Sequence, residues 1–444
     1  MKKISKIKIR KPELLAPAGN LEKMKTAFAF GADAVYAGIP DFSLRTRIND
    51  FTLESLAQAV TYAHERKKKV YVTINIFAHN EHLAKLPNYL KSLKKINPDA
   101  LIVSDPGVIA IIKKHWPEAE IHLSTQANCT NGAAAVFWQQ AGVKRVILGR
   151  EVAYEDILAI KKEAPKLELE SFIHGAMCMA YSGRCFLSKY LVDRSGNLGD
   201  CVQPCRWHYS AKSQKPKDQR LDNESIIISP DGHDVEFELI EEEHGSYILN
   251  SNDMCLMRRM PELMVSGLDS LKIEGRAKSA YYLAVVVGAY RQAIDVLYES
   301  KMEAKAQKRF AEKSYKELED KLVHRGYTEG FMFGQGQLAQ NLVNSHNSCA
   351  WEFCGQVVSA SAGMQLINGK KKLTLVKIHN ALRVGDQIEV LLPGCGIIKK
   401  KVDKIWDSAT GESLASAHGG QGKAVLIDFK KDVPEYSVIR RKTS

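Results

Sequence analysis

The chain has 444 residues, of which 45% are hydrophobic and nine are cysteines, so it is long enough to bury a large core. Its 63 basic and 51 acidic residues give a net charge of +12 that lies entirely at the two ends. Residues 1–11 carry six basic residues and no acid, residues 349–444 are net +6, and residues 12–348 hold 42 of each sign. No apolar run of about 18 residues occurs, and the N-terminus lacks the apolar core of a secretory signal. We therefore expect a cytoplasmic protein whose cysteines do not form a disulfide framework.

From residue 13 onward, short apolar runs alternate with amphipathic stretches. The runs predicted to be strands are 14–17, 34–38, 70–75, 100–104, 121–124, 145–148, 167–172 and 270–274. Helical spacing is found over 53–66, 83–95, 132–141, 153–163 and 280–298. Eight strands that alternate with helices are typical of a closed (β/α)₈ TIM-like barrel, which we expect over residues 12–300. A doubly wound open sheet is the alternative, but no glycine-rich phosphate turn follows the first strand.

A long insertion separates the seventh and eighth predicted strands. It spans about 95 residues, far more than one barrel helix needs, and its cysteine-rich part runs from about residue 174 to 250. Because it leaves the C-terminal end of a barrel strand, where barrel enzymes build their active sites, it is expected to form a site or a lid.

Two further segments follow the barrel. Residues 301–348 begin with a highly charged predicted helix, 301–324, and continue into a glycine-rich connector, 326–336. From residue 349 the pattern changes to short alternating strands, predicted at 356–359, 373–376, 387–391, 402–405 and 424–427. Five or six short strands in about 90 residues predict a small β-barrel.

Four cysteines of the insertion, Cys178, Cys185, Cys201 and Cys205, have the spacing C-x6-C-x15-C-x3-C. Four thiolates can hold an iron–sulfur cluster or a tetrahedral zinc ion, and unliganded or nucleophilic cysteines are the third possibility. The absence of a C-x2-C knuckle weakens the zinc interpretation. Cys255, further along the chain, could replace one of the four. The remaining cysteines are expected to be small buried hydrophobes: Cys129, Cys349, Cys354 and Cys395.

Signals for a hydrolase are weak. Residues 64–68 resemble the zinc-protease pattern H-E-x-x-H but lack its last histidine, and no G-x-S-x-G nucleophile motif is present. A pair of Cys178 with His174 depends on a local helix that the sequence does not establish.

Several polar residues follow predicted strands and are expected to meet at one mouth of the barrel. The candidates for catalysis are Asn75, Glu170, His174 and Glu274. The candidates for binding a small organic acid are Gln126, Lys272 and Arg276, since lysine and arginine bind carboxylates. The alternative is that some of these residues form salt bridges that close the end of the barrel.

Basic runs in the C-terminal segment point to a polyanionic partner. The densest are 370–372, 399–401 and 440–442. Lysine contacts to phosphate supply affinity without sequence information, which suits docking of RNA on a separate domain. The alternative for each run is a solvated turn.

At the cysteine insertion the sequence resembles a known family. Residues 170–178, ESFIHGAMC, followed by 183–188, GRCFLS, are similar to the signature of the collagenase-like peptidase family. Residues 15–20, 31–36, 250–253 and 272–276 resemble further blocks of that family, and 352–357 and 384–388 resemble a β-barrel found in one branch.

That branch consists of enzymes that hydroxylate the wobble uridine of tRNA to 5-hydroxyuridine and depend on prephenate. The resemblance implies an iron–sulfur cluster, expected to be of the 4Fe–4S type, on Cys178, Cys185, Cys201 and Cys205, with Cys255 as the alternate fourth ligand. It also implies an oxygen-independent hydroxylase with tRNA as partner and prephenate as co-substrate, with no membrane and no obligate protein partner. The rival expectations are a peptidase and an RNA-binding factor with a structural zinc.

Overall fold

The structure is a computed structural model of the chain. It describes residues 10–43, 50–178, 180–181, 184–185, 187–198, 200–207, 209–211, 226–230, 237–239, 251–299, 302–334, 349–359, 373–394, 396–420 and 422–443. The N-terminal tail up to residue 9, most of the acidic part of the insertion, Cys395 and the basic run 370–372 lie outside the described residues. In the described part of the chain, no helix is both long and apolar enough to span a membrane.

Eight parallel strands close into a barrel. Each pairs with the next in chain order, and the last, β12, pairs in parallel with both β1 and β7. The strands are β1 (Glu13–Pro17), β2 (Ala34–Ala37), β3 (Lys69–Ile74), β4 (Ala100–Val103), β5 (Ile121–Leu123), β6 (Arg145–Ile147), β7 (Glu168–Ala176) and β12 (Ser270–Ile273). The predicted barrel is therefore confirmed.

Helices surround the barrel and bury their apolar stripes against it. They are α1 (Leu21–Ala29), α2 (Leu53–His64), α3 (Asn80–Ile96), α4 (Pro106–His115), α5 (Gly132–Gln140), α6 (Tyr154–Glu163), α8 (Met260–Leu263) and α9 (Ala280–Glu299). Side chains of Asn20, Asp105 and Asn131 cap α1, α4 and α5 by accepting a backbone N–H of the first turn. Short 3₁₀ turns lie between them: η1 (Pro40–Phe42), η2 (Thr125–Ala127) and η7 (Met257–Arg259).

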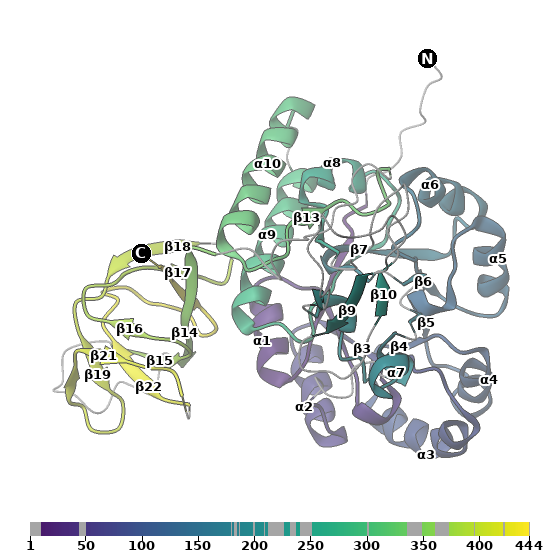
Figure 1. Cartoon of the computed structure of the whole chain (residues 1–444), viewed down its shortest axis with the longest axis horizontal. Helices are drawn as coiled ribbons and strands as arrows, with labels where there is room; N and C mark the ends of the chain where they lie inside the picture. Colours follow the sequence, from purple (N-terminus) through teal and green to yellow (C-terminus); the bar gives the residue numbers. More distant parts are fainter. Residues whose placement is uncertain are drawn as a thin grey trace.

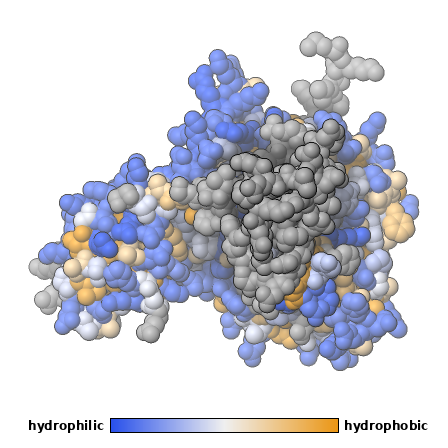
Figure 2. All heavy atoms as spheres, viewed as in Figure 1, coloured by the Kyte–Doolittle hydropathy of each residue, from blue (hydrophilic) through white to orange (hydrophobic). Residues whose placement is uncertain are grey.

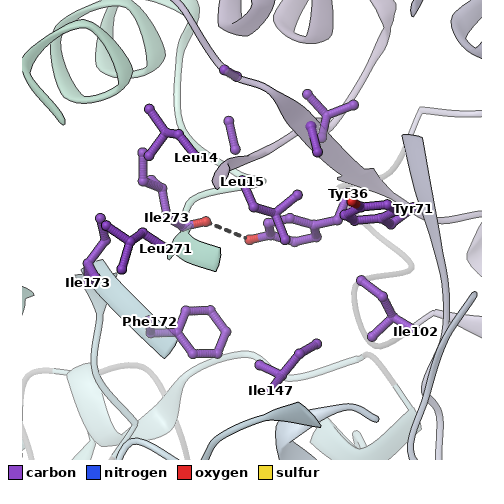
Figure 3. Packing of buried hydrophobic residues seen from close by; sticks show 14 of the residues in the cluster. Leu14, Leu15, Tyr36, Tyr71, Ile102, Ile147, Phe172, Ile173, Leu271 and Ile273 are labelled. Atoms are coloured by element: carbon purple, nitrogen blue, oxygen red, sulfur yellow. Dashed lines mark hydrogen bonds between the residues drawn. The ribbon is translucent and has the colours of Figure 1, made fainter. Parts of the chain in front are cut away.

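The barrel interior is apolar at several strand positions. Figure 3 shows Ile102, Ile147 and Phe172 around one space, with Leu14 and Leu15 of β1 packed behind. In the same view the hydroxyl of Tyr36 donates a hydrogen bond to the carbonyl oxygen of Ile273, 3.0 Å away. This bond ties β2 to the end of β12 at the mouth of the barrel.

Strand β7 extends past its predicted end at residue 172 and reaches Ala176. Its extension pairs with β11 (Asp253–Cys255), which is antiparallel to β7, and β11 pairs with β13 (Tyr327–Thr328). Gly175 has a φ of +110°, and a Cβ atom there would lie 2.5 Å from the carbonyl oxygen of Glu274. Glycine is therefore required where β7 passes the end of β12.

The described part of the insertion contains short elements only. They are α7 (Leu187–Val192), η4 (Gly196–Leu198), η5 (Pro204–Arg206), and the small sheet of β8 (Tyr209–Ala211), β9 (Ile226–Pro230) and β10 (Phe237–Leu239). In the view of Figure 1, β9 and β10 lie in front of the barrel strands, and α7 lies on the side of α3 and α4.

A second domain follows α10 (Ala304–Lys321). Its described strands form an antiparallel sheet in the order β18-β17-β23-β14-β15-β22-β19-β20, beside a pair formed by β16 and β21. The bounds are β14 (Trp351–Ser359), β15 (Thr374–Ile378), β16 (Leu382–Arg383), β17 (Gln387–Leu391), β18 (Ile397–Lys401), β19 (Ile405–Asp407), β20 (Ser413–Leu414), β21 (Ser416–Ala417), β22 (Ala424–Ile427) and β23 (Val438–Lys442). The predicted strands of this domain are confirmed in the main, but 402–405 is wrong, because the strand there begins only at Ile405.

Two of the basic runs lie in strands rather than in open turns. Lys399–Lys401 belongs to β18, and residues 440–442 end β23. Arg440 is fully buried and bonded to Glu389 and Glu317, while Arg441 bonds Glu352 and Asp386. Carboxylates thus already neutralise both guanidinium groups, so neither the expected phosphate contacts nor a solvated turn describes Arg440 and Arg441, whereas Lys442 is exposed.

The β-domain packs directly on the barrel helices, beside α9 and α10 (Figure 1). Phe353 of β14 stacks on Tyr281 of α9 with ring centroids 5.4 Å apart, and Gln356 donates to the hydroxyl of Thr26, 2.9 Å away. Leu391 and Val438 belong to the same buried core as the barrel. The outer surface of α10 and much of the β-domain are hydrophilic in Figure 2.

Candidate active site

A cavity opens at the C-terminal mouth of the barrel, where strand ends and the cysteine insertion meet. Its lining comes from the ends of β2, β3, β5, β6, β7 and β12 and from residues 176–205. Among the polar lining residues are Thr73, Asn75, Ser124, Gln126, Arg150, Lys272, Glu274 and Arg276. The position agrees with the rule that barrel enzymes build their sites from the segments that follow the strands.

All four cysteines of the C-x6-C-x15-C-x3-C pattern line this cavity: Cys178, Cys185, Cys201 and Cys205. Among the described residues none of the four is in a disulfide; Cys178 is exposed and the others are partly buried. Partial burial, together with the nearby thiols of Cys178 and Cys201, raises the pKa of Cys185. The structure therefore brings together residues that are up to 27 positions apart in the sequence.

The backbone holds two of these thiols in place. The N–H of Leu187 donates to the Sγ of Cys185 at 3.4 Å, and the N–H of Gln203 donates to the Sγ of Cys201 at 3.3 Å. Gln203 adopts a left-handed conformation, with φ of 59°, that starts η5, the turn that carries Cys205. Such N–H to sulfur bonds stabilise thiolates and tune bound metal centres.

The donor set suits an iron–sulfur cluster, because ligation by four cysteines is the common pattern and four thiols line this one cavity. In the described part of the chain, no group of three or more His, Cys, Asp or Glu side chains is arranged to hold a single metal ion.

Cys255 lies away from this cavity. It is 2% exposed in β11, opposite His174 of β7, and its Sγ is 3.8 Å from the hydroxyl oxygen of Tyr290. Burial raises the pKa of its thiol to about 12. The geometry thus separates Cys255 from the four cysteines of the insertion.

Three cations from the barrel strands and the segments after them also line the cavity. Lys272 is 2.9 Å from a carboxylate oxygen of Glu170 and lies over the rings of Tyr36 and Phe172. Arg276 donates to the hydroxyl of Ser43 at 2.8 Å. Burial lowers the pKa of Lys272, and the carboxylate of Glu170 opposes that effect.

Arg150 is the third cation, and the sequence analysis does not single it out. Its guanidinium lies 3.9 Å from the centre of the Phe172 ring and 3.3 Å from a carboxylate oxygen of Glu274. It follows β6 by three residues, so the same strand-end rule that singles out Arg276 would have found it.

Two amide side chains complete the lining. Asn75 lies at the end of β3, and its Nδ2 donates to the hydroxyl of Ser124 at 3.3 Å. The Oε1 of Gln126 accepts from the same hydroxyl, and Arg184 of the insertion donates to the carbonyl oxygen of Gln126 at 2.7 Å. The amides of Asn75 and Gln126 therefore stand together where the insertion joins the barrel.

Glu170 does not line the cavity. It is fully buried inside the barrel, where one carboxylate oxygen accepts from Lys272 and the other lies 3.1 Å from Arg145. Burial alone would raise the pKa of Glu170, but Lys272 and Arg145 outweigh it and lower the pKa to about 2. Glu170 therefore forms a salt bridge that holds Lys272, which is the alternative considered for the strand-end residues, and it does not contact a ligand in the cavity.

His174 does not line the cavity either, because β7 continues through it. Its ring is packed among Tyr282, Tyr290 and Tyr327, with centroids 5.4 to 5.9 Å away, and burial lowers its pKa to about 3. Cys178 lines the cavity and His174 does not, so the structure does not bring together the pair that a cysteine peptidase would need.

Comparison with known proteins agrees with the resemblance in the sequence. The model of "Peptidase family U32" matches residues 19–341, and that of "Peptidase family U32 C-terminal domain" matches residues 350–440. The chain is 39% identical to the tRNA hydroxylation protein P of Escherichia coli (strain K12), over 98% of this chain and 97% of that protein.

Two further relatives are also named for the hydroxylation of RNA. The tRNA hydroxylation protein P1 of Bacillus subtilis (strain 168) is 36% identical, over 96% of this chain and 93% of that protein. A 23S rRNA 5-hydroxycytidine synthase of Escherichia coli (strain K12) is 32% identical, over 72% of this chain and 45% of that protein. On the two family models and these relatives, the chain belongs to peptidase family U32.

Proposed function

We propose that this protein is a tRNA-modifying enzyme that hydroxylates the wobble uridine to 5-hydroxyuridine, without molecular oxygen and with prephenate as co-substrate. The observation that carries the proposal is one cavity lined both by four cysteines of the insertion and by cations and amides from the barrel strands and the segments after them. The relatives named for tRNA hydroxylation, similar over nearly the whole chain, support the substrate class.

The thiols of Cys178, Cys185, Cys201 and Cys205 would hold an iron–sulfur cluster of the 4Fe–4S type. When bound there, the cluster would supply redox chemistry beside the target base. Cys205 is preferred to Cys255 as the fourth ligand, because Cys205 lines the cavity while Cys255 is buried against Tyr290.

The side chains of the cavity would bind the two small partners of the reaction. Lys272 and Arg276 would hold a carboxylate of the organic acid, since both present N–H donors there. The amides of Asn75 and Gln126 can each donate and accept, which matches the alternating donors and acceptors on the edge of a uracil base. Glu170 would keep Lys272 in place from below.

The first test is nucleoside analysis in a bacterial strain that lacks its own tRNA-hydroxylating enzymes. Expression of the wild-type chain is expected to restore 5-hydroxyuridine-derived nucleosides, measured by mass spectrometry of digested tRNA. Growth without oxygen is expected to leave that level unchanged. A complemented strain with no such nucleosides, despite soluble protein, would contradict the proposed function.

The second test identifies the cluster ligands. Iron and sulfide are measured in protein purified without oxygen, for Cys205→Ser, Cys255→Ser and the control Cys129→Ser, whose thiol is buried elsewhere. We expect Cys205→Ser to lose iron and nucleoside formation together, and the other two variants to keep both. Iron loss in Cys255→Ser alone would assign the fourth ligand to Cys255, and zinc at one per chain in the wild type would favour the structural-zinc alternative.

A further inference from the structure

Arg150 uses few of its hydrogen-bond donors although it lines the cavity. Its guanidinium carries five N–H donors, and among the described residues it donates one hydrogen bond, to Glu274 at 3.3 Å. Arg145, by contrast, donates four hydrogen bonds, to Glu13, Glu168 and Glu170. Arg150 therefore has donors left for a ligand in the cavity that it lines.

Packing already fixes the plane of this guanidinium. Its central carbon lies 3.9 Å from the centre of the Phe172 ring, and its side chain is only 12% exposed. A stacked arginine loses less conformational freedom when it binds a planar anion, and its fork matches a carboxylate in two places.

Lys272 stands beside the same ring. Its Nζ is 5.3 Å from the centre of Phe172 and, among the described residues, donates one of its three N–H bonds, to Glu170. Two cations with unused donors thus lie within 5.3 Å of the centre of one aromatic ring and line the same cavity. A ligand with a single carboxylate would leave one of the two cations unused.

We infer that Arg150 binds a second carboxylate of the organic acid, so that the cavity selects a dicarboxylate over a monocarboxylate. The inference rests on the proposed function for the organic acid and adds a specificity-determining residue to it. Arg150 would exchange its single contact with Glu274 for a two-point contact with the ligand.

The test compares prephenate, a dicarboxylate, with phenylpyruvate, a monocarboxylate that also lacks the ring hydroxyl, so the variants of Arg150 rather than the wild type alone assign the preference to the carboxylate. Binding to the full-length protein, purified without oxygen, is measured by calorimetry at pH 8, with no tRNA and no turnover. We expect the wild type to prefer prephenate by about tenfold or more, as hydrogen bonds to a charged group allow. Arg150→Met is expected to lose that preference by weakening prephenate while leaving phenylpyruvate unchanged.

A matched control exists in Arg259, which lies 4.6 Å from the centre of Phe333, pairs with Glu329, and does not line the cavity. Arg259→Met is expected to keep the preference, and Arg150→Lys to recover part of it. Equal weakening of both acids by Arg150→Met, or no change in either, would overturn the inference, as would a wild type that binds neither acid or does not distinguish them.

An RNA phosphate is the competing ligand for Arg150. Weaker tRNA binding in Arg150→Met with unchanged acid binding would also overturn the inference and assign Arg150 to the RNA backbone. Nucleoside analysis measures hydroxylation of tRNA separately from acid binding. A negative result for the two acids would therefore overturn the role of Arg150 without contradicting the modification of tRNA.

Discussion

Glu170 shows how a charged side chain can lie at the centre of a barrel. Its carboxylate is shared between Lys272, 2.9 Å away, and Arg145, 3.1 Å away, and all three side chains are at most 5% exposed. Removing one partner from such a buried group leaves the others as unpaired charges, which is more costly than replacing the whole group. The ammonium group of Lys272 therefore depends on a residue that no ligand reaches.

We predict that Glu170→Gln lowers the free energy of unfolding by about 3–5 kcal/mol at pH 7, since it removes the carboxylate that Lys272 pairs with, while Arg145 keeps Glu13 and Glu168. The folded-state pKa of Glu170 is lowered to about 2, below its unfolded value of about 4.3. The stabilisation is thus present above pH 4.3 and is lost as the pH falls toward 2. Thermal unfolding at several pH values is expected to show the gap between wild type and variant narrowing over that window.

Glu168→Gln is the matched control for this prediction. Glu168 bonds the same Arg145 from the same strand but is 22% exposed, so water replaces part of the missing interaction. Its effect at pH 7 is expected to be smaller than that of Glu170→Gln. Equal losses in the free energy of unfolding for the two substitutions would contradict the prediction that burial makes the pairing of Glu170 more important than that of Glu168.

At the scale of elements, helix α10 and strand β23 join the two domains. Arg440 of β23, fully buried, bonds both Glu389 of β17 and Glu317 of α10, and the ammonium of Lys321 lies 3.2 Å from the ring centre of Trp351. This one guanidinium ties the β-domain internally and to the helix at once.

We expect Arg440→Met to lower the free energy of unfolding by about 3–5 kcal/mol, because Glu389 stays buried without its main partner. Lys399→Met is the control on the same carboxylate: Lys399 is 80% exposed and 3.6 Å from Glu389, so little change is expected. Hydrogen exchange read by mass spectrometry is expected to show faster exchange in both α10 and β23 for Arg440→Met. Faster exchange confined to β23 would contradict a role at the domain junction.

At the scale of the whole molecule, the excess charge is less concentrated than the sequence indicates. Carboxylates neutralise Arg440 and Arg441, Lys400 is largely buried, and Arg10 pairs with Asp269. In β18, Lys399 and Lys401 remain exposed on one face. If RNA docks on the β-domain, we expect Lys399 and Lys401, among the residues that the structure describes, to bind its phosphates.

We predict that the double variant Lys399→Gln and Lys401→Gln weakens tRNA binding and lowers its salt dependence, by about one in slope for each phosphate that the variant no longer binds. Lys91→Gln with Lys95→Gln makes the same change of charge on α3, on the far side of the barrel from the β-domain (Figure 1), and should change the slope little. Fluorescence anisotropy at several salt concentrations measures both. If the salt dependence of tRNA binding has the same slope in both double variants, the RNA does not bind at Lys399 and Lys401.

Substitution serves this purpose better than removal of residues 349–444. Leu391 and Val438 of the β-domain share the core of the barrel, and Phe353 stacks on Tyr281. Cutting the domain away would expose that apolar surface, so weaker RNA binding could reflect unfolding rather than the removal of the lysines that bind phosphate.

The sequence by itself determined the barrel, because strands such as 34–38 and 100–104 are short continuous apolar runs between helices of clear period, a pattern fixed by local burial. It also singled out Cys178, Cys185, Cys201 and Cys205, since four cysteines within 28 residues form a pattern that is visible without the fold. Arg440 could not be interpreted in this way, because its carboxylate partners lie 51 and 123 positions away in the chain.

Only the tertiary structure decided which polar residues reach the cavity. Period-two alternation would place Glu170, Phe172 and His174 on one face of β7, but the pairing with β12 shifts register between Phe172 and His174, and β7 continues four residues past its predicted end. That extension encloses His174 among tyrosines, while Glu170 is withdrawn beneath Lys272 and Arg150 is brought to the cavity from another strand. Charge pairing and side-chain direction depend on partners distant in sequence, which local patterns do not encode.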